Sequence, residues 1–347
     1  MILIFAELSA AASRWFPEVT PGSAVVLAGI LLALAMGSVI RLTWLKFAST
    51  DKAKTSTKSL ESWWVIFGLF SLAALGGRFW AAALLGGISV LGFREYLALS
   101  GQDRTRRPAS FWAQAGIALH YGWILLGWTD WFPVFLPVGM FLFLCARTIL
   151  AGGTSDYLKD LSEVFWGLML TAYCFSHAAL LLTLPANGNP AGGNLGWLIY
   201  LVLLTESNDV AQALIGRRFG KRRLIPGISP GKTWEGLIGG AITTLVLAVA
   251  LAPLLTPWSE GPTLRIGEWE GNPPFLWAFV AGLLIASGGV LGDLNMSAVK
   301  RDAGVKDSGT AVPGQGGILD RMDSLTFTAP LFFYFVYYLH YATAGTP

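Results

Sequence analysis

Charged residues are scarce in this chain. Only 13% of its 347 residues are Asp, Glu, Lys or Arg, whereas 54% are hydrophobic. A soluble globular protein carries about 25% charged residues, so this composition argues against a soluble fold. The mean hydropathy of +0.57 points in the same direction. The sequence therefore predicts an integral membrane protein.

Cysteine and histidine are also scarce, and neither residue type has the spacing of a metal site. The two cysteines, Cys145 and Cys174, lie in apolar segments, which excludes a disulfide framework and favours small buried side chains. The three histidines, His120, His177 and His340, lie in separate apolar segments, where we expect them to pack. The first sixteen residues lack the basic start, long apolar run and cleavage site of a signal peptide.

Long apolar segments, by contrast, are abundant. Ten of them are long enough to cross a bilayer, or nearly so. They cover residues 23–45, 62–77, 79–97, 111–128, 131–150, 164–184, 195–215, 237–255, 275–291 and 325–341. We expect an all-α polytopic integral membrane protein with about ten transmembrane helices, and eight to ten fit the pattern. We divide it into N-terminal transmembrane helices, residues 1–200, and a C-terminal transmembrane domain, residues 201–347.

Lysine and arginine fall almost entirely in alternate connections between these segments. Of the 24 such residues, only Arg14, Arg78 and Arg265 fall on the other side. Cytoplasmic loops of membrane proteins are enriched in these two residue types. The pattern predicts that both termini lie outside and that every odd-numbered connection is cytoplasmic.

One charged stretch, residues 292–323, interrupts the apolar pattern near the C-terminus. Its charged residues are Asp293, Lys300, Arg301, Asp302, Lys306, Asp307, Asp320, Arg321 and Asp323. If the ninth helix continues into this stretch, positions 293, 297, 300 and 301 share one face. That face would present an acid, a hydroxyl and two cations, although a solvated helix end is the alternative interpretation.

Glycine and proline dominate residues 308–317. Five of these residues are Gly or Pro, which excludes a regular helix. Successive free backbone N–H groups form an anion-binding nest, and a flexible loop is the alternative. The acid and base cluster that follows favours a binding loop.

A second polar block lies between the seventh and eighth segments. Glu206 and Asp209 are three residues apart inside the seventh segment, where ionisable side chains are costly and usually functional. Lys232, Thr233 and Glu235 precede the eighth segment. The Gly-Lys-Thr triplet there is not a phosphate-binding P-loop, because Pro226 occupies the position of the required first glycine.

These two blocks together indicate phosphoryl chemistry. Mg²⁺ prefers a few carboxylates together with substrate phosphates. Asp293 and Asp320 are candidates to hold it, and Lys300, Arg301, Lys306 and Arg321 are candidates to hold phosphates. Such a site acts mainly by positioning and by electrostatic stabilisation.

The chain resembles the phosphatidate cytidylyltransferase family, whose enzymes make CDP-diacylglycerol. The match consists of Ser297, Lys300-Arg301, Lys306-Asp307, Pro313-Gly314, Gly316-Gly317, Asp320-Arg321 and Asp323, at the spacing of the family signature. Upstream, Asn208-Asp209 and the run from Ser229 to Gly236 match a second block of the family. The resemblance covers about residues 207–324.

The resemblance implies a reaction, an ion and a set of site residues. A phosphatidate oxygen attacks the α-phosphorus of CTP, and pyrophosphate leaves. A divalent metal, Mg²⁺, with K⁺ as a further ion, is implied at Asp293 and Asp320. The implied catalytic residues are Asp293, Lys300, Arg301, Lys306, Asp307, Asp320, Arg321 and Asp323. The implied substrate-binding residues are Asn208, Asp209, Ser229, Lys232, Thr233, Glu235, Ser297, Gln315, Gly316 and Gly317. A homodimer is common in the family, and no nucleic acid partner is expected. The expected location is the bacterial inner membrane, with the active site facing the cytoplasm, and the C-terminal domain, residues 201–347, is then the catalytic domain.

Two positions depart from the family pattern. Gln315 stands where the family has His, and Met296 stands where it commonly has Glu. Glutamine donates and accepts hydrogen bonds but cannot shuttle a proton. We therefore expect a divergent member of the family that retains catalysis. Another acidic lipid is an alternative acceptor of the cytidylyl group. The alternatives are a CTP-dependent lipid kinase and an inactive membrane scaffold. A transporter is disfavoured, because no internal repeat is visible and the charges sit at helix ends.

Overall fold

The structure is a computed structural model in which helices account for almost all regular structure. It describes residues 19–45, 50–99, 108–150, 157–259, 264–266, 269–271, 273–312 and 316–341. The α-helices are α2 (Pro21–Leu45), α3 (Thr50–Leu75), α4 (Arg78–Leu99), α5 (Pro108–Leu126), α6 (Phe132–Val134), α7 (Phe141–Leu150), α8 (Tyr157–Leu168), α9 (Phe175–Leu180), α10 (Gly193–Phe219), α11 (Trp234–Leu255), α12 (Leu276–Asp302), α13 (Leu319–Met322) and α14 (Leu325–His340).

Short elements complete the described part of the chain. The 3-10 and π turns are η2 (Thr129–Trp131), η3 (Phe135–Met140), η4 (Met169–Cys174), η5 (Leu181–Thr183) and η6 (Ala186–Gly188). Two antiparallel hairpins consist of β1 (Arg223–Ile225) with β2 (Ser229–Thr233) and of β3 (Leu264–Ile266) with β4 (Trp269–Gly271). The sequence analysis did not anticipate either hairpin. Both lie in connections between helices, so the description as an all-α protein holds for the membrane part.

Seven of the described helices are long and apolar enough to cross a membrane. They are Pro21–Thr43, Arg78–Leu99, Thr129–Leu150, Tyr157–Thr183, Gly193–Phe219, Trp234–Leu255 and Leu276–Asp302. The other three predicted segments also coincide with helices, namely the apolar part of α3 (Leu60–Leu75), α5 and α14. An all-α polytopic membrane protein is confirmed, whereas the count of ten spans stays a prediction. The division at residue 200 also stays a prediction, and it falls within α10.

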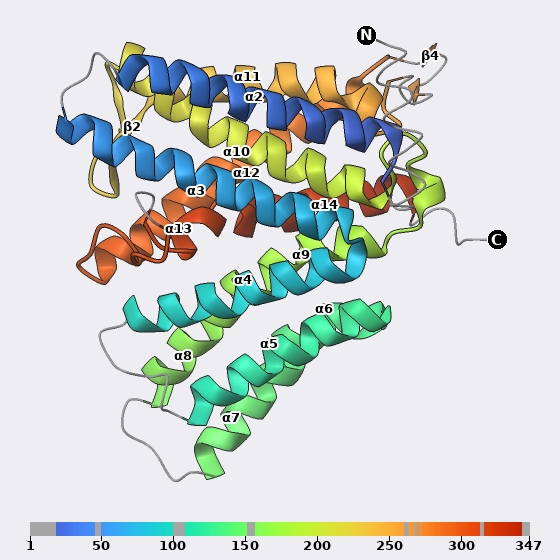
Figure 1. Ribbon diagram of the computed structural model, residues 1–347. Coiled ribbons are helices and arrows are strands. Elements are labelled where there is room, and N and C mark those ends of the chain that lie inside the picture. Colours follow the sequence, from blue (N-terminus) through green and yellow to red (C-terminus); the bar gives the residue numbers. More distant parts are fainter. Residues whose placement is uncertain are drawn as a thin grey trace.

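Helices α10, α11, α12 and α14 form a closely packed group, with α2 beside it and α4, α8 and α9 on another side (Figure 1). Glycine permits the close approach, as expected where membrane helices pack. A Cβ atom on Gly236 of α11 would lie 2.7 Å from the carbonyl oxygen of Gln212 on α10. A Cβ on Gly282 of α12 would lie 2.8 Å from the Cβ of Ala248 on α11. The backbones of α10, α11 and α12 therefore pack directly against one another, without long side chains between them.

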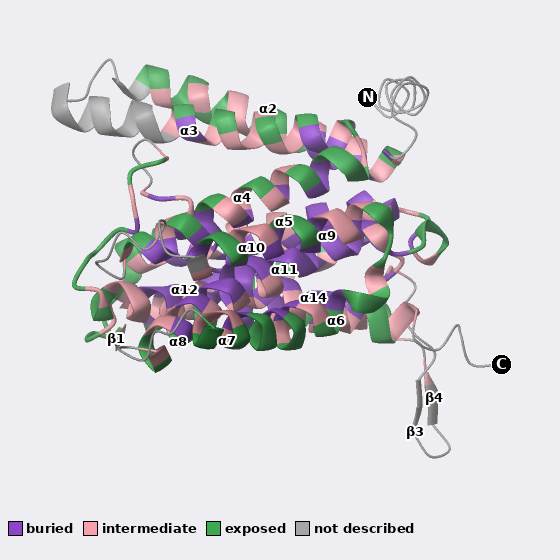
Figure 2. Cartoon of the chain, turned by 90° about the horizontal axis from the view of Figure 1, so that it is seen from below, coloured by how far each residue is buried: buried purple, intermediate pink, exposed green. Residues whose placement is uncertain are grey.

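The distribution of buried residues suits a lipid environment. Figure 2 shows buried residues concentrated along the middle of the bundle, including α10, α11 and α12. Large apolar side chains such as Leu32, Met36 and Val39 on α2 are exposed. In water such a face would be unfavourable, but acyl chains of a bilayer cover it without cost.

Hydrogen bonds define one end of the bundle. Ser23 at the start of α2 donates to the carbonyl of Gly192 at 2.9 Å, and Asn189 donates to the carbonyl of Leu255 at the end of α11 at 2.8 Å. Trp197 near the start of α10 donates to the hydroxyl of Tyr341 after α14 at 3.3 Å. The other ends of these helices therefore meet at the opposite end, which agrees with the alternation predicted from Lys and Arg.

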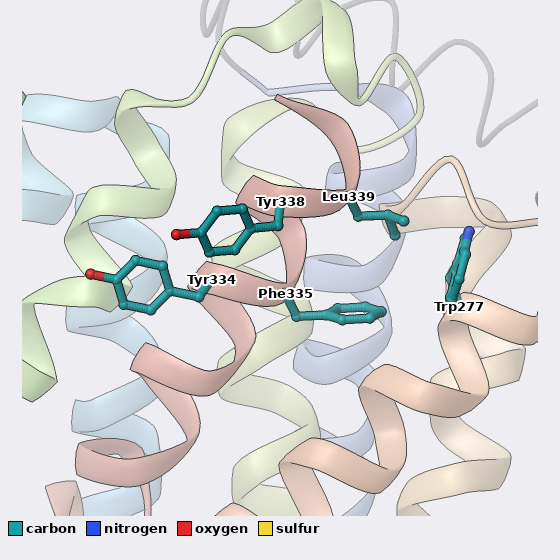
Figure 3. Close-up of a pocket in the computed structure, with 5 residues that line it drawn as sticks. All are labelled: Trp277, Tyr334, Phe335, Tyr338 and Leu339. Atoms are coloured by element: carbon teal, nitrogen blue, oxygen red, sulfur yellow. The ribbon is translucent and has the colours of Figure 1, made fainter. Parts of the chain in front are cut away.

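An apolar pocket of about 380 Å³ lies between the first residues of α12 and the last turns of α14. Trp277, Tyr334, Phe335, Tyr338 and Leu339 line it. In Figure 3, Phe335 and Leu339 extend toward Trp277, while Tyr334 and Tyr338 extend in the opposite direction. Aromatic side chains at this level fit the interfacial belt of a membrane protein. The pocket contains none of the predicted site residues.

We predict that the tip of the β1–β2 hairpin and the η6 turn lie on opposite sides of the membrane. In a background without Cys145 and Cys174, Gly227→Cys should react with an impermeant maleimide only in inverted vesicles. Asn187→Cys should react only in intact cells, because the positive-inside rule places it outside. Both positions are exposed, so access to the reagent is matched. Labelling of both from the same side would contradict the predicted topology.

Candidate active site

Helix α12 continues well beyond its apolar part and ends at Asp302. Positions 293, 297, 300 and 301 therefore lie on one helix, as the sequence spacing predicted. Ser297 Oγ donates to Asp293 Oδ1 at 3.2 Å. Asp293 Oδ2 also lies 2.7 Å from Lys232 Nζ, in an ion pair in which both side chains are largely shielded. The prediction of one shared face for the acid and the hydroxyl is confirmed.

Lys232 reaches Asp293 from strand β2, which the sequence analysis did not identify as a strand. Thr233, the next residue, caps α11 by accepting a hydrogen bond from the N–H of Gly236 at 3.1 Å. Glu235 accepts from the N–H groups of Lys221 and Arg222 at 3.0 and 3.2 Å. In this structure Thr233 and Glu235 therefore hold the hairpin in place, and Lys232 is the side chain that the hairpin delivers to the site.

Asp320 anchors the described residues between α12 and α13, 303–312 and 316–318, which we call the signature loop. Its Oδ1 lies 2.6 Å from Lys300 Nζ, and its Oδ2 accepts from the N–H and hydroxyl of Ser308, both at 2.9 Å, and from the N–H of Gly317 at 3.0 Å. Burial acts to raise the pKa of Asp320, but the hydrogen bonds from Lys300, Gly317 and Ser308 outweigh it and lower that pKa. Both carboxylate oxygens of Asp320 therefore have protein donors, Lys300 at Oδ1 and the signature loop at Oδ2.

A glycine is required at the return of the signature loop. Gly316 has φ +92°, a left-handed conformation that disfavours other residues, and a Cβ there would lie 2.6 Å from Asp320 Oδ2. The adjacent N–H of Gly317 already binds Asp320, so in this structure it is not free for an anion. The glycines permit close packing around a carboxylate, a role that the spacing alone did not reveal.

Glu95 on α4 also contacts the signature loop, and the sequence analysis missed it. Its Oε2 accepts from the N–H of Leu319 at 2.9 Å and from the hydroxyl of Ser308 at 3.2 Å. The available signal was an acid near the C-terminal end of an apolar segment, next to Arg94, because an ionisable side chain there is costly unless it has a partner. No spacing rule connects position 95 with position 319.

Three carboxylates from different segments repel one another near these ion pairs. Burial, followed by the negative charges of Asp293 and Asp209, raises the pKa of Asp323 well above its ordinary value. Asp209 in turn lies within electrostatic range of Glu206, Asp293 and Lys232. Charged residues of α10, α12 and the α13–α14 turn therefore form one electrostatic unit.

Buried polar atoms without a protein partner gather on α10 beside this unit. They are Asn208 Nδ2, Asp209 Oδ1 and Gln212 Nε2, which lie within about one turn of helix. Buried polar groups are normally paired, so such a concentration marks a place for a ligand, an ion or water. Gln212 was not among the predicted residues, although its spacing of four from Asn208 puts both on one face.

Oxygen donors suited to Mg²⁺ are present, but they are not arranged as a ready-made metal site. Among the described residues, no group of three or more His, Cys, Asp or Glu side chains is placed to hold a metal ion. The repelling carboxylates and the unpartnered oxygen of Asp209 fit a hard cation. Asp293 is paired with Lys232, however, and Asp320 with Lys300. Metal binding at Asp293 and Asp320 therefore stays a prediction.

The remaining predicted residues take different positions. Arg301 donates to the backbone oxygens of Val305 at 2.9 Å and Ile228 at 3.3 Å, so it links α12 to the hairpin. Lys306 and Asp307 are exposed on the signature loop. Asn208 accepts a hydrogen bond from the hydroxyl of Thr244 at 3.2 Å. Arg321 lies within electrostatic range of Glu206. Ser229 is the first residue of β2. Gln315 lies outside the described residues.

Comparison with known proteins gives one family match and several relatives. A model of the cytidylyltransferase family matches residues 57–339. The uncharacterised protein YnbB of Escherichia coli K12 is 40% identical over 317 residues, which is 91% of this chain and 98% of that protein. A phosphatidate cytidylyltransferase of Haemophilus influenzae is 44% identical over 142 residues, 41% of this chain and 46% of the enzyme. One of Bacillus subtilis is 33% identical over 195 residues, 56% of this chain and 64% of the enzyme. The chain thus matches less than two thirds of each of these two enzymes.

We predict that Gly292→Ala damages the site and Gly87→Ala does not. A Cβ at Gly292 would lie 2.6 Å from the carbonyl oxygen of Asp323 and 3.0 Å from the Cα of Ser324, so α12 would be pushed away from the α13–α14 turn. Gly87 is also helical but has nothing within 4 Å of that position. Overpacking costs about 1–3 kcal/mol, so the melting temperature of Gly292→Ala in detergent should fall clearly. Equal melting temperatures for the two variants would contradict the close contact.

Proposed function

The chain belongs to the cytidylyltransferase family, and we propose that it transfers the cytidylyl group of CTP to phosphatidate. A phosphate oxygen of phosphatidate forms a bond to the α-phosphorus of CTP. The bond from that phosphorus to the oxygen bridging to the β-phosphate breaks. CDP-diacylglycerol and pyrophosphate are the products.

One observation carries the proposal. Charged side chains from segments far apart in the sequence meet at a single end of an otherwise apolar bundle. Lys232 of β2 pairs with Asp293 of α12, and Lys300 of α12 pairs with Asp320 of α13. A nucleoside triphosphate needs cations around its phosphates, and a phosphatidate headgroup lies at the membrane boundary where helices end. The arrangement supports a reaction between a soluble nucleotide and a lipid.

We propose that the two lysines bind phosphate groups when the nucleotide enters. A triphosphate competes with Asp293 for Lys232 and with Asp320 for Lys300, because each lysine is held by a single carboxylate in these pairs. Oδ2 of Asp293 and Oδ1 of Asp320 are then available as oxygen ligands, while Oδ2 of Asp320 stays bound to Ser308 and Gly317. When bound, Mg²⁺ would neutralise the charge that develops on the leaving pyrophosphate. Asp293 and Asp320 are the proposed ligands of Mg²⁺, and K⁺ as a further ion belongs to the same proposal.

The orientation follows from the substrates. CTP is a cytoplasmic nucleotide, and the lysine-rich and arginine-rich connections predict that the same end of the bundle is cytoplasmic. We therefore propose a bacterial inner membrane location with this end facing the cytoplasm. The family resemblance also supports a homodimer as a proposal.

The position of the transferred phosphorus distinguishes this proposal from a lipid kinase. With purified full-length protein, Mg²⁺ and phosphatidate, label from the α-phosphate of CTP should enter the lipid and label from the γ-phosphate should enter pyrophosphate. Diacylglycerol, which lacks the attacking phosphate, should accept no label. Transfer of γ-label to any lipid would contradict cytidylyl transfer and establish a kinase.

A further inference from the structure

We infer that Glu95 of α4 is a positioning residue that holds the signature loop in the geometry needed for cytidylyl transfer. This inference rests on the proposed function and deepens it. It assigns a role in the reaction to the N-terminal helices, which carry almost none of the family's sequence signature.

Glu95 contacts Ser308 within the signature loop and Leu319 directly after it. Its Oε2 accepts from the N–H of Leu319, immediately before Asp320, and from the hydroxyl of Ser308. Ser308 contacts Asp320 through both its N–H and its hydroxyl. Glu95 and Asp320 thus hold the same residue from two sides, one carboxylate from α4 and one from α13.

The backbone of the signature loop also approaches the Glu95 side chain closely at two glycines. A Cβ at Gly309 would lie 2.9 Å from Glu95 Oε1, and a Cβ at Gly317 would overlap with Oε2. Both glycines therefore allow the loop to pass close to this carboxylate. Such packing leaves the loop little freedom to shift relative to α4.

The chemistry of the donors explains why a carboxylate suits this position. Glu95 faces an N–H and an O–H donor, and an ionised carboxylate is an acceptor only. Hydrogen bonds to a charged acceptor are about twice as strong as neutral ones. The single hydroxyl proton of Ser308 serves one acceptor at a time, at 2.9 Å to Asp320 or 3.2 Å to Glu95. The Ser308 hydroxyl therefore lies between Glu95 and Asp320 and can donate to either carboxylate.

Displacement of the loop would move Asp320, and with it Lys300, which pairs with Asp320 at 2.6 Å. A misplacement of about 1 Å far from the reacting atoms can cost roughly 100-fold in rate. Glu95 touches no reacting atom in this account. Replacement of Glu95 should therefore lower kcat more than it raises the KM for CTP.

The test compares Glu95→Ala, Glu95→Gln and Glu61→Ala in the full-length protein. Glu61 is an exposed acid on the neighbouring α3 and serves as the matched control. Glu95→Ala should lower kcat for cytidylyl transfer about 10- to 100-fold, with a smaller change in KM. Glu95→Gln keeps one acceptor oxygen and should recover part of the rate, whereas Glu61→Ala should match the wild type. Unchanged kcat in Glu95→Ala would overturn the inference.

Hydrogen exchange gives a second measurement that does not depend on the reaction. Peptides covering residues 303–323 should exchange faster in Glu95→Ala than in the wild type, and Glu61→Ala should leave them unchanged. If the wild type transfers no cytidylyl group, the proposed function fails, and exchange alone decides whether Glu95 anchors the loop. Faster exchange would support the anchor and equal exchange would overturn it. If Glu95→Ala does not fold, Glu95→Gln carries both measurements.

Discussion

The ion pair between Lys300 and Asp320 is the interaction on which the rest of the charged end depends. It is 2.6 Å long, and both side chains are largely shielded from solvent. Removing one partner of a buried pair costs about 3–5 kcal/mol, because the other charge is left uncompensated. The pair joins the end of α12 to α13. Ser308, Gly317 and Glu95 then arrange the signature loop around the same carboxylate.

The apolar bundle makes this concentration of charge possible. Close contacts at Gly236, Gly240 and Gly282 bring α10, α11 and α12 together, so their ends present side chains to one another. Ionisable groups are expensive inside a bilayer but much less so at its boundary. The structure places the lysine–aspartate pairs beyond the apolar part of α12 and leaves aromatic and aliphatic side chains for the lipid. A soluble nucleotide and a lipid headgroup can both reach such a position.

Local patterns in the sequence predicted a large part of this arrangement. Apolar length revealed the helices, and the spacing of Asp293 and Ser297 revealed their shared face, because both depend only on helix geometry. The contact between Glu95 and Leu319 was not predictable, because it joins positions 224 apart and follows no spacing rule. The β1–β2 hairpin was missed as well, since Gly231 and Pro230 obscure its pattern. The contacts of Asp320 with Ser308 and Gly317 were not predictable either, because they depend on how the signature loop folds back.

The central claim is that this charged end is the reaction centre, and Asp293 tests it most directly. The measurement is Mg²⁺-dependent incorporation of α-labelled CTP into phosphatidate by wild type, Asp293→Asn and Asp302→Asn, at equal amounts of folded protein. Asp302 is an exposed acid on the same helix and outside the proposed machinery. The account predicts roughly 100-fold less product for Asp293→Asn and an unchanged rate for Asp302→Asn. Equal incorporation by wild type and Asp293→Asn would contradict it.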